Sequence, residues 1–206
     1  MRKIIAAAMI SLDGVMQAPG GADEDTSGGF AHGGWVWPHA DGSDEVMGGV
    51  FSRPYELLLG RRTYDIFAAY WPHRRGDGSY GDIASGFNGT IKHVATHHPD
   101  SLEWRNSRAL GRDVAGAVRE LKRSVGPDLV TQGSSDLLHQ LLATDLVDEL
   151  RLLVYPVLLG RGKRLFDDGA QASTFRLAES QTTPAGVLVT RYVRDDEVRT
   201  GSPEST

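Results

Sequence analysis

Short apolar runs alternate with helical patterns over most of this chain, and the end of the chain is rich in strands. The runs of strand length are residues 2–11, 57–59, 91–96, 129–131, 149–155, 173–181 and 186–193. Alternating strands and helices predict an α/β fold. The consecutive runs at the end predict a mixed, mostly parallel central sheet that is flanked by helices and has antiparallel last strands.

Helices are expected in the gaps between these runs. Ser43 can cap a helix that ends near residue 51, and a short helix follows Thr63. Valine and leucine at helical spacing predict a helix after Asp113, and leucines predict another after Gly133. Residues 74–89 are rich in glycine and are expected to be irregular.

The length and charge of the chain exclude several classes of protein. Its 206 residues suit one domain over residues 1–194, followed by a polar, frayed tail over 195–206. A net charge of −5 argues against nucleic-acid binding, and no apolar run reaches the ~20 residues that span a bilayer. The apolar N-terminus resembles a buried strand more than an export signal, so the cytoplasm is the default compartment.

No metal site is expected. The chain has no cysteine, which excludes disulfides and thiolate ligands. His93 and His97 would lie roughly 13 Å apart along one strand, too far to share an ion.

The longest segment without a regular pattern is residues 17–42. It is rich in glycine and acidic residues, yet it contains Trp35 and Trp37. Long loops inside compact domains are functional or disordered, and disordered segments are poor in aromatic residues. The composition therefore favours a partly ordered flap over a site, although the aromatic residues could instead pack on a neighbouring subunit.

Three of the expected strands end in groups that suit an anion. LLLGRRT ends in basic and hydroxyl residues, Thr96 and His97 follow another strand, and Gly133 leads directly into a helix. A helix N-terminus binds phosphate through its free N–H groups. Together the three ends suit one extended, multiply phosphorylated ligand at the sheet edge, although each alone could be a solvated turn or an ordinary cap.

The order of five segments resembles the dihydrofolate reductase superfamily. The segments are SLDG after the first strand, LLLGRRTY, the strand that ends in Thr96, VTQGSSDLLHQLL and PVLLGRGKRLF, within residues 2–193. The closest likeness is to the branch that contains the C-terminal reductase domain of bifunctional riboflavin-biosynthesis proteins. This resemblance implies a dihydrofolate-reductase-like three-layer fold with an eight-stranded sheet, NADPH as the cofactor and a homodimer.

The resemblance also implies roles for individual residues. It implies that Arg61 and Thr63 hold cofactor phosphates and that Thr96 and His97 lie near the 2′-phosphate. It also implies that the start of the helix after Gly133 surrounds the pyrophosphate. The residues implied to contact the cofactor are Met9, Ile10, Gly60, Arg61, Thr63, Thr96, His97, Gly133, Ser134, Ser135, Asp136 and Leu137. The second glycine of the family's Gly-Gly pair is replaced here by Ser134.

Two acids are candidates for catalysis. Asp44 corresponds most nearly to the catalytic carboxylate of dihydrofolate reductases, and Asp13 is the other acid near the reacting centre. Either could be structural, Asp44 as a helix-start charge and Asp13 in a turn.

Substrate contacts are expected from two other segments. Trp35 or Trp37 would stack on a flat ring. Gly160 would let the chain turn sharply beside a substrate, and Arg164 or Lys163 would meet a substrate phosphate or belong to a solvated basic turn.

The expected function is an NADPH-dependent reductase. It would transfer hydride to a C=N or C=O of a small heterocycle, resembling a pyrimidine or pterin. The resemblance points to riboflavin-biosynthesis 5-amino-6-(5-phosphoribosylamino)uracil reductase. The alternatives are a dihydrofolate reductase proper and a non-catalytic module for nucleotide binding or dimerisation.

Overall fold

The computed structural model describes residues 1–41, 49–74, 78–195 and 197–202. Residues 42–48 hold most of the helix predicted to begin at Ser43, together with the candidate acid Asp44. Both of these predictions lie outside the described residues.

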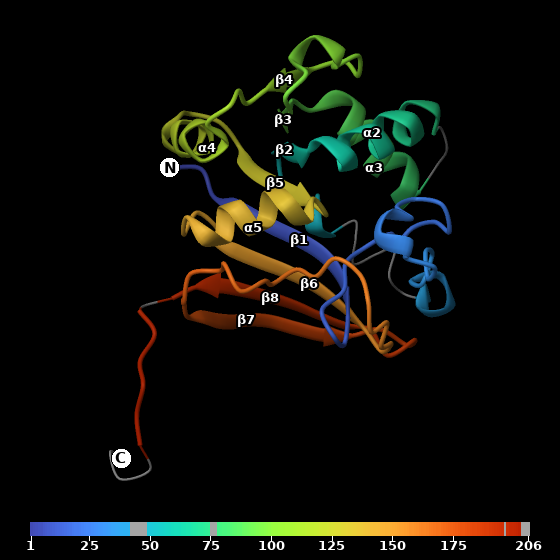
Figure 1. Cartoon of the computed structure of the whole chain (residues 1–206), viewed down its shortest axis with the longest axis vertical. Coiled ribbons are helices and arrows are strands. Elements are labelled where there is room, and N and C mark those ends of the chain that lie inside the picture. Colours follow the sequence, from blue (N-terminus) through green and yellow to red (C-terminus); the bar gives the residue numbers. More distant parts are fainter. Residues whose placement is uncertain (42–48, 75–77, 196, 203–206) are drawn as a thin grey trace.

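Within the described residues, eight strands form one sheet in the order β4-β3-β2-β5-β1-β6-β8-β7 (Figure 1). The strands are β1 (Ile4–Ser11), β2 (Tyr55–Gly60), β3 (Lys92–Ala95), β4 (Ser107–Ala109), β5 (Asp128–Gln132), β6 (Glu149–Tyr155), β7 (Phe175–Thr182) and β8 (Leu188–Arg194). The strands from β4 to β6 in this order pair in parallel, and β8 and β7 add antiparallel pairs at one edge. The predicted mixed, mostly parallel sheet is confirmed.

The sheet is covered on both faces because its central strand is apolar on both. Alternate residues of a strand point to opposite faces. Ile4 and Ala6 of β1 pack in one core cluster with the leucines of α5 (Ser135–Ala143), whereas Ile5 and Ala7 pack in another with Val130.

Helices lie on both sides of this sheet and make three layers (Figure 1). The helix α4 (Val114–Arg123) joins α5 on one face through Val118. Its predicted cap is confirmed, since the Asp113 carboxylate accepts a hydrogen bond from the Gly116 N–H at 2.9 Å. On the other face, α2 (Arg61–Tyr70) and α3 (Ser79–Gly89) pack against β2 and β3.

Helix α3 corrects the prediction that residues 74–89 are irregular. Glycine is a poor helix former, so the local sequence argues against a helix here. Ile83 and Phe87 nevertheless lie one turn apart and are buried against β2 and Trp104. Gly86 faces Tyr55 so closely that a Cβ would lie 2.6 Å from the tyrosine oxygen. Tertiary burial therefore outweighs the weak propensity of the segment.

Two smaller differences have local causes. The strand β4 was not predicted because it is three residues long and carries only one apolar residue. Helix α2 begins at Arg61 rather than after Thr63, directly from the end of β2.

The chain beyond β8 extends away from the body of the protein (Figure 1). Residues 197–202 have no regular secondary structure. Among the described helices, none has the length and apolar character needed to cross a membrane.

A buried lysine stabilises the junction of α3 and β3. Lys92 has no exposed surface, and its Nζ donates to the carbonyl oxygens of Phe87 at 2.6 Å and Thr90 at 2.9 Å. The ammonium also lies 4.2 Å from the centre of the Trp104 ring. Burial lowers the pKa of Lys92 to about 8, and the charge of Arg105 acts in the same direction.

This pKa predicts a stability that increases with pH. Between about pH 8 and 10.5 the unfolded chain holds more protons at Lys92 than the folded protein does. The free energy of unfolding of the wild type, relative to Lys92→Met, should therefore increase by about 1–2 kcal/mol between pH 7.5 and 9.5. Urea unfolding of both proteins at the two pH values measures this difference. An equal difference at both pH values would contradict the prediction.

Candidate functional site

The carboxyl ends of three strands meet at one edge of the sheet. β2 lies between β3 and β5, and Gly60 is in register with Ala95. These ends border a cavity of about 730 Å³, here called the polar cavity. Its lining includes the predicted cofactor residues Met9, Gly60, Arg61, Thr63, Thr96, His97, Gly133, Ser134, Ser135, Asp136 and Leu137. The structure thus brings these residues together, and their contact with a cofactor remains a prediction.

Ile10 differs from this group. Its side chain is buried in the core cluster that contains the leucines of α5, and it does not line the cavity. Met9 and Ile10 are consecutive residues of β1, so their side chains point to opposite faces and only Met9 reaches the site.

Two helices begin at the polar cavity. Gly60 and Ser134 are the N-caps of α2 and α5, and neither helix has a side-chain hydrogen bond at its cap. The first N–H groups of both helices are therefore available to an anion. The negative charge of Asp136 is favourable at the positive end of α5. A phosphate, however, could bind only to the backbone N–H of Asp136 and not to its carboxylate.

Helix α2 places two cations where its own dipole disfavours them. Arg61 and Arg62 occupy its first turn, which contains no acid. Positive side chains at a helix N-terminus are unfavourable, and an anion bound there removes the repulsion. Arg61 pairs with Asp65 one turn away, and its Nη1 donates to Thr96 Oγ1 at 3.2 Å. This contact fixes the start of α2 against the end of β3.

The turn from β5 into α5 has an uncommon backbone. Gly133 and Ser134 both have positive φ, +73° and +67°. Ser134 Oγ accepts a hydrogen bond from the N–H of Gly60 at 2.9 Å. The serine that replaces the second family glycine therefore joins the ends of β2 and β5, at the cost of a left-handed conformation.

A buried carboxylate anchors the flap beside the polar cavity. Asp25 forms ion pairs with Arg62 of α2 and with Lys163, whose Nζ lies 2.7 Å away. Burial would raise the pKa of Asp25, but hydrogen bonds from Lys163 and Ser27 outweigh it and lower the pKa to about 2. Asp25 and both cations line the cavity.

Asp13 has a structural role in the described geometry. Its carboxylate accepts hydrogen bonds from Ser11 Oγ at 2.6 Å and from the N–H groups of Leu159 and Gly160. The bond from Ser11 is the main cause that holds the pKa of Asp13 well below its usual range. Asp13 lines neither the polar cavity nor the second cavity described below, and its predicted catalytic role stays untested.

The same contacts place Gly160 and Arg164 away from the site. Arg164 Nη2 donates to the Gly160 carbonyl at 3.1 Å and lies 3.5 Å from Asp13. Neither residue lines the polar cavity, and Lys163 lines it instead. Gly160 and Arg164 thus lie outside the polar cavity, and their expected contact with a substrate stays a prediction.

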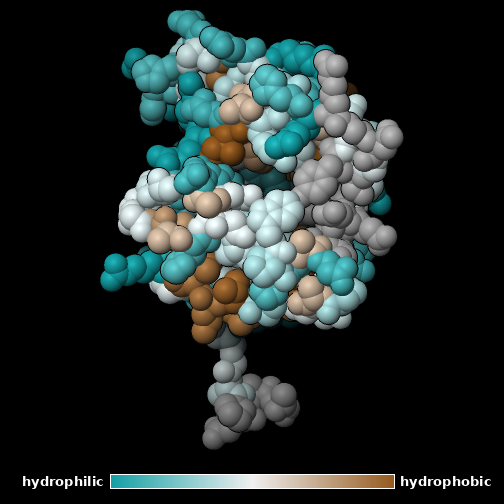
Figure 2. Space-filling view, turned by 90° about the vertical axis from the view of Figure 1, so that its right-hand side faces the viewer, coloured by the Kyte–Doolittle hydropathy of each residue, from teal (hydrophilic) through white to brown (hydrophobic). Residues whose placement is uncertain are grey.

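A second cavity, of about 640 Å³, lies between the flap and helices α2 and α3 and is here called the aromatic cavity. Its aromatic lining residues are Trp37, Phe51, Phe67, Tyr70, Trp71, Phe87 and Tyr155. Figure 2 views this side of the molecule, where hydrophobic side chains border a recess near the centre of the face.

Only one of the two predicted tryptophans reaches this cavity. Trp37 lines it, with its Nε1 donating to the Gly20 carbonyl at 2.9 Å. Trp35 is 7% exposed, bonds to the Gln17 carbonyl and packs edge-on against Tyr155. Trp35 thus packs inside the flap and does not line the cavity, while its predicted stacking on a substrate stays untested.

The two cavities share a wall. The shared residues are Met9, Pro19, Glu24, Ile66, Phe67 and Gln132. Glu24 accepts a hydrogen bond from the Gly20 N–H at 2.6 Å, and burial raises the pKa of its carboxyl group. Gln132 Oε1 is buried and has no hydrogen-bond partner among the described residues.

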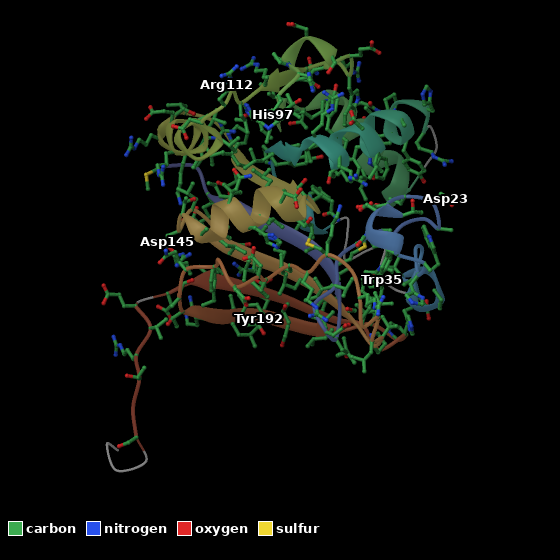
Figure 3. The ribbon with its side chains drawn as sticks, in the orientation of Figure 1. Asp23, Trp35, His97, Arg112, Asp145 and Tyr192 are labelled. Atoms are coloured by element: carbon green, nitrogen blue, oxygen red, sulfur yellow. The ribbon has the colours of Figure 1, made fainter. Side chains whose placement is uncertain are left out.

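Sequence reasoning missed several of these groups. Gln132 directly precedes the predicted glycine turn, and Arg112 directly precedes the helix cap at Asp113, so both could have been found by position. Figure 3 shows Arg112 and His97 at the same end of the molecule, and both line the polar cavity. Glu24 carried no signal because nothing in the sequence of a loop determines which side chains point inward, whereas Lys163 was an alternative to Arg164 for a substrate phosphate and lines the polar cavity.

Comparisons with known proteins agree with this architecture. Residues 2–189 match the family described as RibD C-terminal domain. The uncharacterized protein YyaP of Bacillus subtilis (strain 168) is 26% identical over 136 residues, covering 66% of this chain and 72% of that protein. The uncharacterized protein YwjB of the same organism is 22% identical over 193 residues, covering 94% and 98%.

Three solved structures share the fold. A putative riboflavin biosynthesis protein from Shewanella sp. PV-4 has a TM-score of 0.57 at 20% identity, covering 94% of this chain and 99% of its own. A pyrimidine reductase-like protein from Corynebacterium diphtheriae has a TM-score of 0.60 at 14% identity, covering 95% and 93%. Dihydrofolate reductase from Enterococcus faecalis, complexed with NADP(H), has the same score and identity, covering 94% and 97%. The dihydrofolate-reductase-like fold is confirmed.

The bond between Ser134 and Gly60 predicts an unusual order of stability for two variants. Ser134→Ala removes the acceptor but keeps a side chain at positive φ, so it should lower the free energy of unfolding by about 1–3 kcal/mol. Ser134→Gly removes the same bond but relieves the left-handed strain, so it should be about 1 kcal/mol more stable than the alanine variant. Urea unfolding of the three proteins measures both effects. An alanine variant at least as stable as the glycine variant would contradict this assignment.

Proposed function

The chain belongs to the RibD C-terminal domain family, and from that premise we propose that it is an NADPH-dependent reductase of a small heterocyclic substrate. The observation that carries the proposal is the division of one continuous site into two cavities. The polar cavity has cations and two open helix starts, whereas the aromatic cavity beside it has seven aromatic lining residues and no cation among the described ones.

The polar cavity has the groups that a phosphorylated dinucleotide needs. The starts of α2 and α5 offer N–H groups for the pyrophosphate. Arg61, His97 and Arg112 lie on the rim and suit a 2′-phosphate, because arginine can form paired bonds to phosphate oxygens. The positive φ of Gly133 and the lack of a Cβ at Gly60 permit close approach of the ligand.

The shared wall is where the two ligands would meet. Met9 supplies an apolar surface there, and Gln132 Oε1 offers an acceptor that no described residue uses. A buried acceptor without a partner is unfavourable, so a ligand N–H at this point would stabilise the complex.

Bound NADPH would supply a hydride to the carbon of the substrate C=N or C=O and become NADP⁺. The electron pair of the double bond then moves to the nitrogen or oxygen, which takes a proton. Glu24 is the described carboxyl group best placed to hold that proton, because it lines both cavities and its pKa is raised. The rest of the chain positions the reactants and excludes water, with the flap over the aromatic cavity.

The cofactor assignment predicts a preference for NADPH over NADH. Isothermal titration calorimetry should give tighter binding of NADPH, and Arg61→Ala and Arg112→Ala should each weaken NADPH binding by roughly tenfold or more while changing NADH binding little. Arg119→Ala, on the exposed surface of α4 and away from the cavity, is the matched control. Equal affinity for the two cofactors would contradict the 2′-phosphate assignment, and failure of both cofactors to bind would contradict the proposal.

The proton-donor assignment predicts a pH dependence. A protonated Glu24 is required, so turnover by the wild type should decrease as pH rises through the raised pKa of this group. Glu24→Gln should lower turnover by roughly 10²–10⁴-fold and remove this dependence, with NADPH affinity kept.

Two further variants complete the test of the proton donor. Glu120→Gln, on exposed helix α4, is the matched control. Asp44→Asn tests the acid that the resemblance implies. Loss of activity in Asp44→Asn with full activity in Glu24→Gln would transfer the role to Asp44.

The rival reading is a binding module without turnover. Tight NADPH binding with no oxidation across pterins, pyrimidines and quinones would favour it. The homodimer implied by the resemblance also remains a prediction, which light scattering of the purified protein tests.

A further inference from the structure

The charged residues of the site are divided unequally between its two cavities. The polar cavity is lined by residues of both signs, namely the cations Arg61, Arg62, Arg112 and Lys163, the acids Glu24, Asp25, Asp65 and Asp136, and His97. Among the described residues that line the aromatic cavity there is no lysine, arginine or histidine. Its charged lining residues are two acids, Asp23 and Glu24.

Two basic side chains contact aromatic residues of this lining. The Arg74 guanidinium is 4.0 Å from the centre of the Tyr70 ring, and the His39 ring contacts Tyr155 edge-on. Neither basic residue lines the cavity itself. The charge that the described lining residues present to a molecule in this cavity is therefore negative or zero.

A phosphate group is poorly suited to such a cavity. A buried charge is costly unless it is paired, and here a dianion would meet carboxylates in place of cations. Like charges that face each other select against a ligand. The rings of Trp37, Phe67 and Phe87 suit instead a flat apolar molecule, and aromatic faces also attract cations.

We infer that the substrate is a planar ring compound without a phosphate, neutral or positively charged. The inference rests on the proposed function, in which the aromatic cavity holds the substrate. It separates this chain from a reductase of the phosphorylated pyrimidine that the family resemblance implies. It also gives Asp23 a role in selecting the substrate, because Asp23 is exposed at this cavity and is not needed for the chemistry.

A matched pair of ligands tests the inference by binding alone. Riboflavin and riboflavin 5′-phosphate have the same ring and differ only in the phosphate. Both are titrated with the full-length protein in saturating NADP⁺, and binding is followed by fluorescence of the flavin. NADP⁺ occupies the polar cavity in the proposed function, so the added phosphate cannot bind there, and no reaction occurs between two oxidised compounds. Riboflavin should bind at least about tenfold more tightly than its phosphate.

Three variants locate the effect. Asp23→Lys places a cation at the aromatic cavity and should strengthen binding of riboflavin 5′-phosphate several-fold relative to binding of riboflavin. Glu120→Lys makes the same change in net charge on α4, away from the cavity, and should change the affinity for neither ligand. Trp37→Ala removes an aromatic surface of the cavity and should weaken riboflavin binding roughly tenfold.

The outcomes separate this inference from the function on which it rests. Equal or tighter binding of the phosphate by the wild type overturns the inference, and so does failure of both rings to bind. Either result leaves the cofactor assignment standing if calorimetry shows NADP⁺ binding. If NADP⁺ does not bind, the proposed function fails. In that case the comparison of the wild type with Asp23→Lys still tests the preference for riboflavin over its phosphate, because this substitution changes only the aromatic cavity.

Discussion

The hydrogen bond between the Gly60 N–H and Ser134 Oγ holds together the part of the protein on which the site depends. It joins the ends of β2 and β5 at the point where each strand turns directly into a helix. Because parallel strands end at the same edge of a sheet, both helix N-termini open on the same cavity. The arginines of α2 and the positive φ of Ser134 are unfavourable in isolation, and a bound anion would offset the effect of the arginines.

The flap connects this edge to the second cavity. Asp25 joins it to α2 and to Lys163 through ion pairs, while Trp35 packs inside it against Tyr155. A close backbone approach completes it, since a Cβ at Gly33 would lie 2.3 Å from the Gly21 carbonyl oxygen. The richness of this segment in glycine therefore reflects compact folding over the site.

The division of charge between the two cavities is the chemical consequence of this arrangement. Cations come from α2, from the segment before α4 and from the loop at 163, which all face the strand ends. The aromatic residues come from α2 and the turn after it, from α3, from the flap, from Phe51 before β2 and from the end of β6, on the other side of Met9 and Gln132. One wall thus separates a region that suits phosphates from a region that suits a flat apolar ring, and hydride transfer requires two such ligands to meet.

The sequence alone determined the α/β class, the mostly parallel sheet, the capped helix α4 and the three strand ends that suit an anion. Each of these follows from local patterns: apolar runs, helical spacing, a cap, and glycine or basic residues at a strand end. Only the tertiary structure decided that α3 is a helix, since burial of Ile83 and Phe87 outweighs its glycines. It also decided which loop side chains face the site. Asp13 and Arg164 pair with each other, whereas Glu24 and Lys163 line the cavities. Loop side chains have no periodicity, so contacts between distant segments determine their direction.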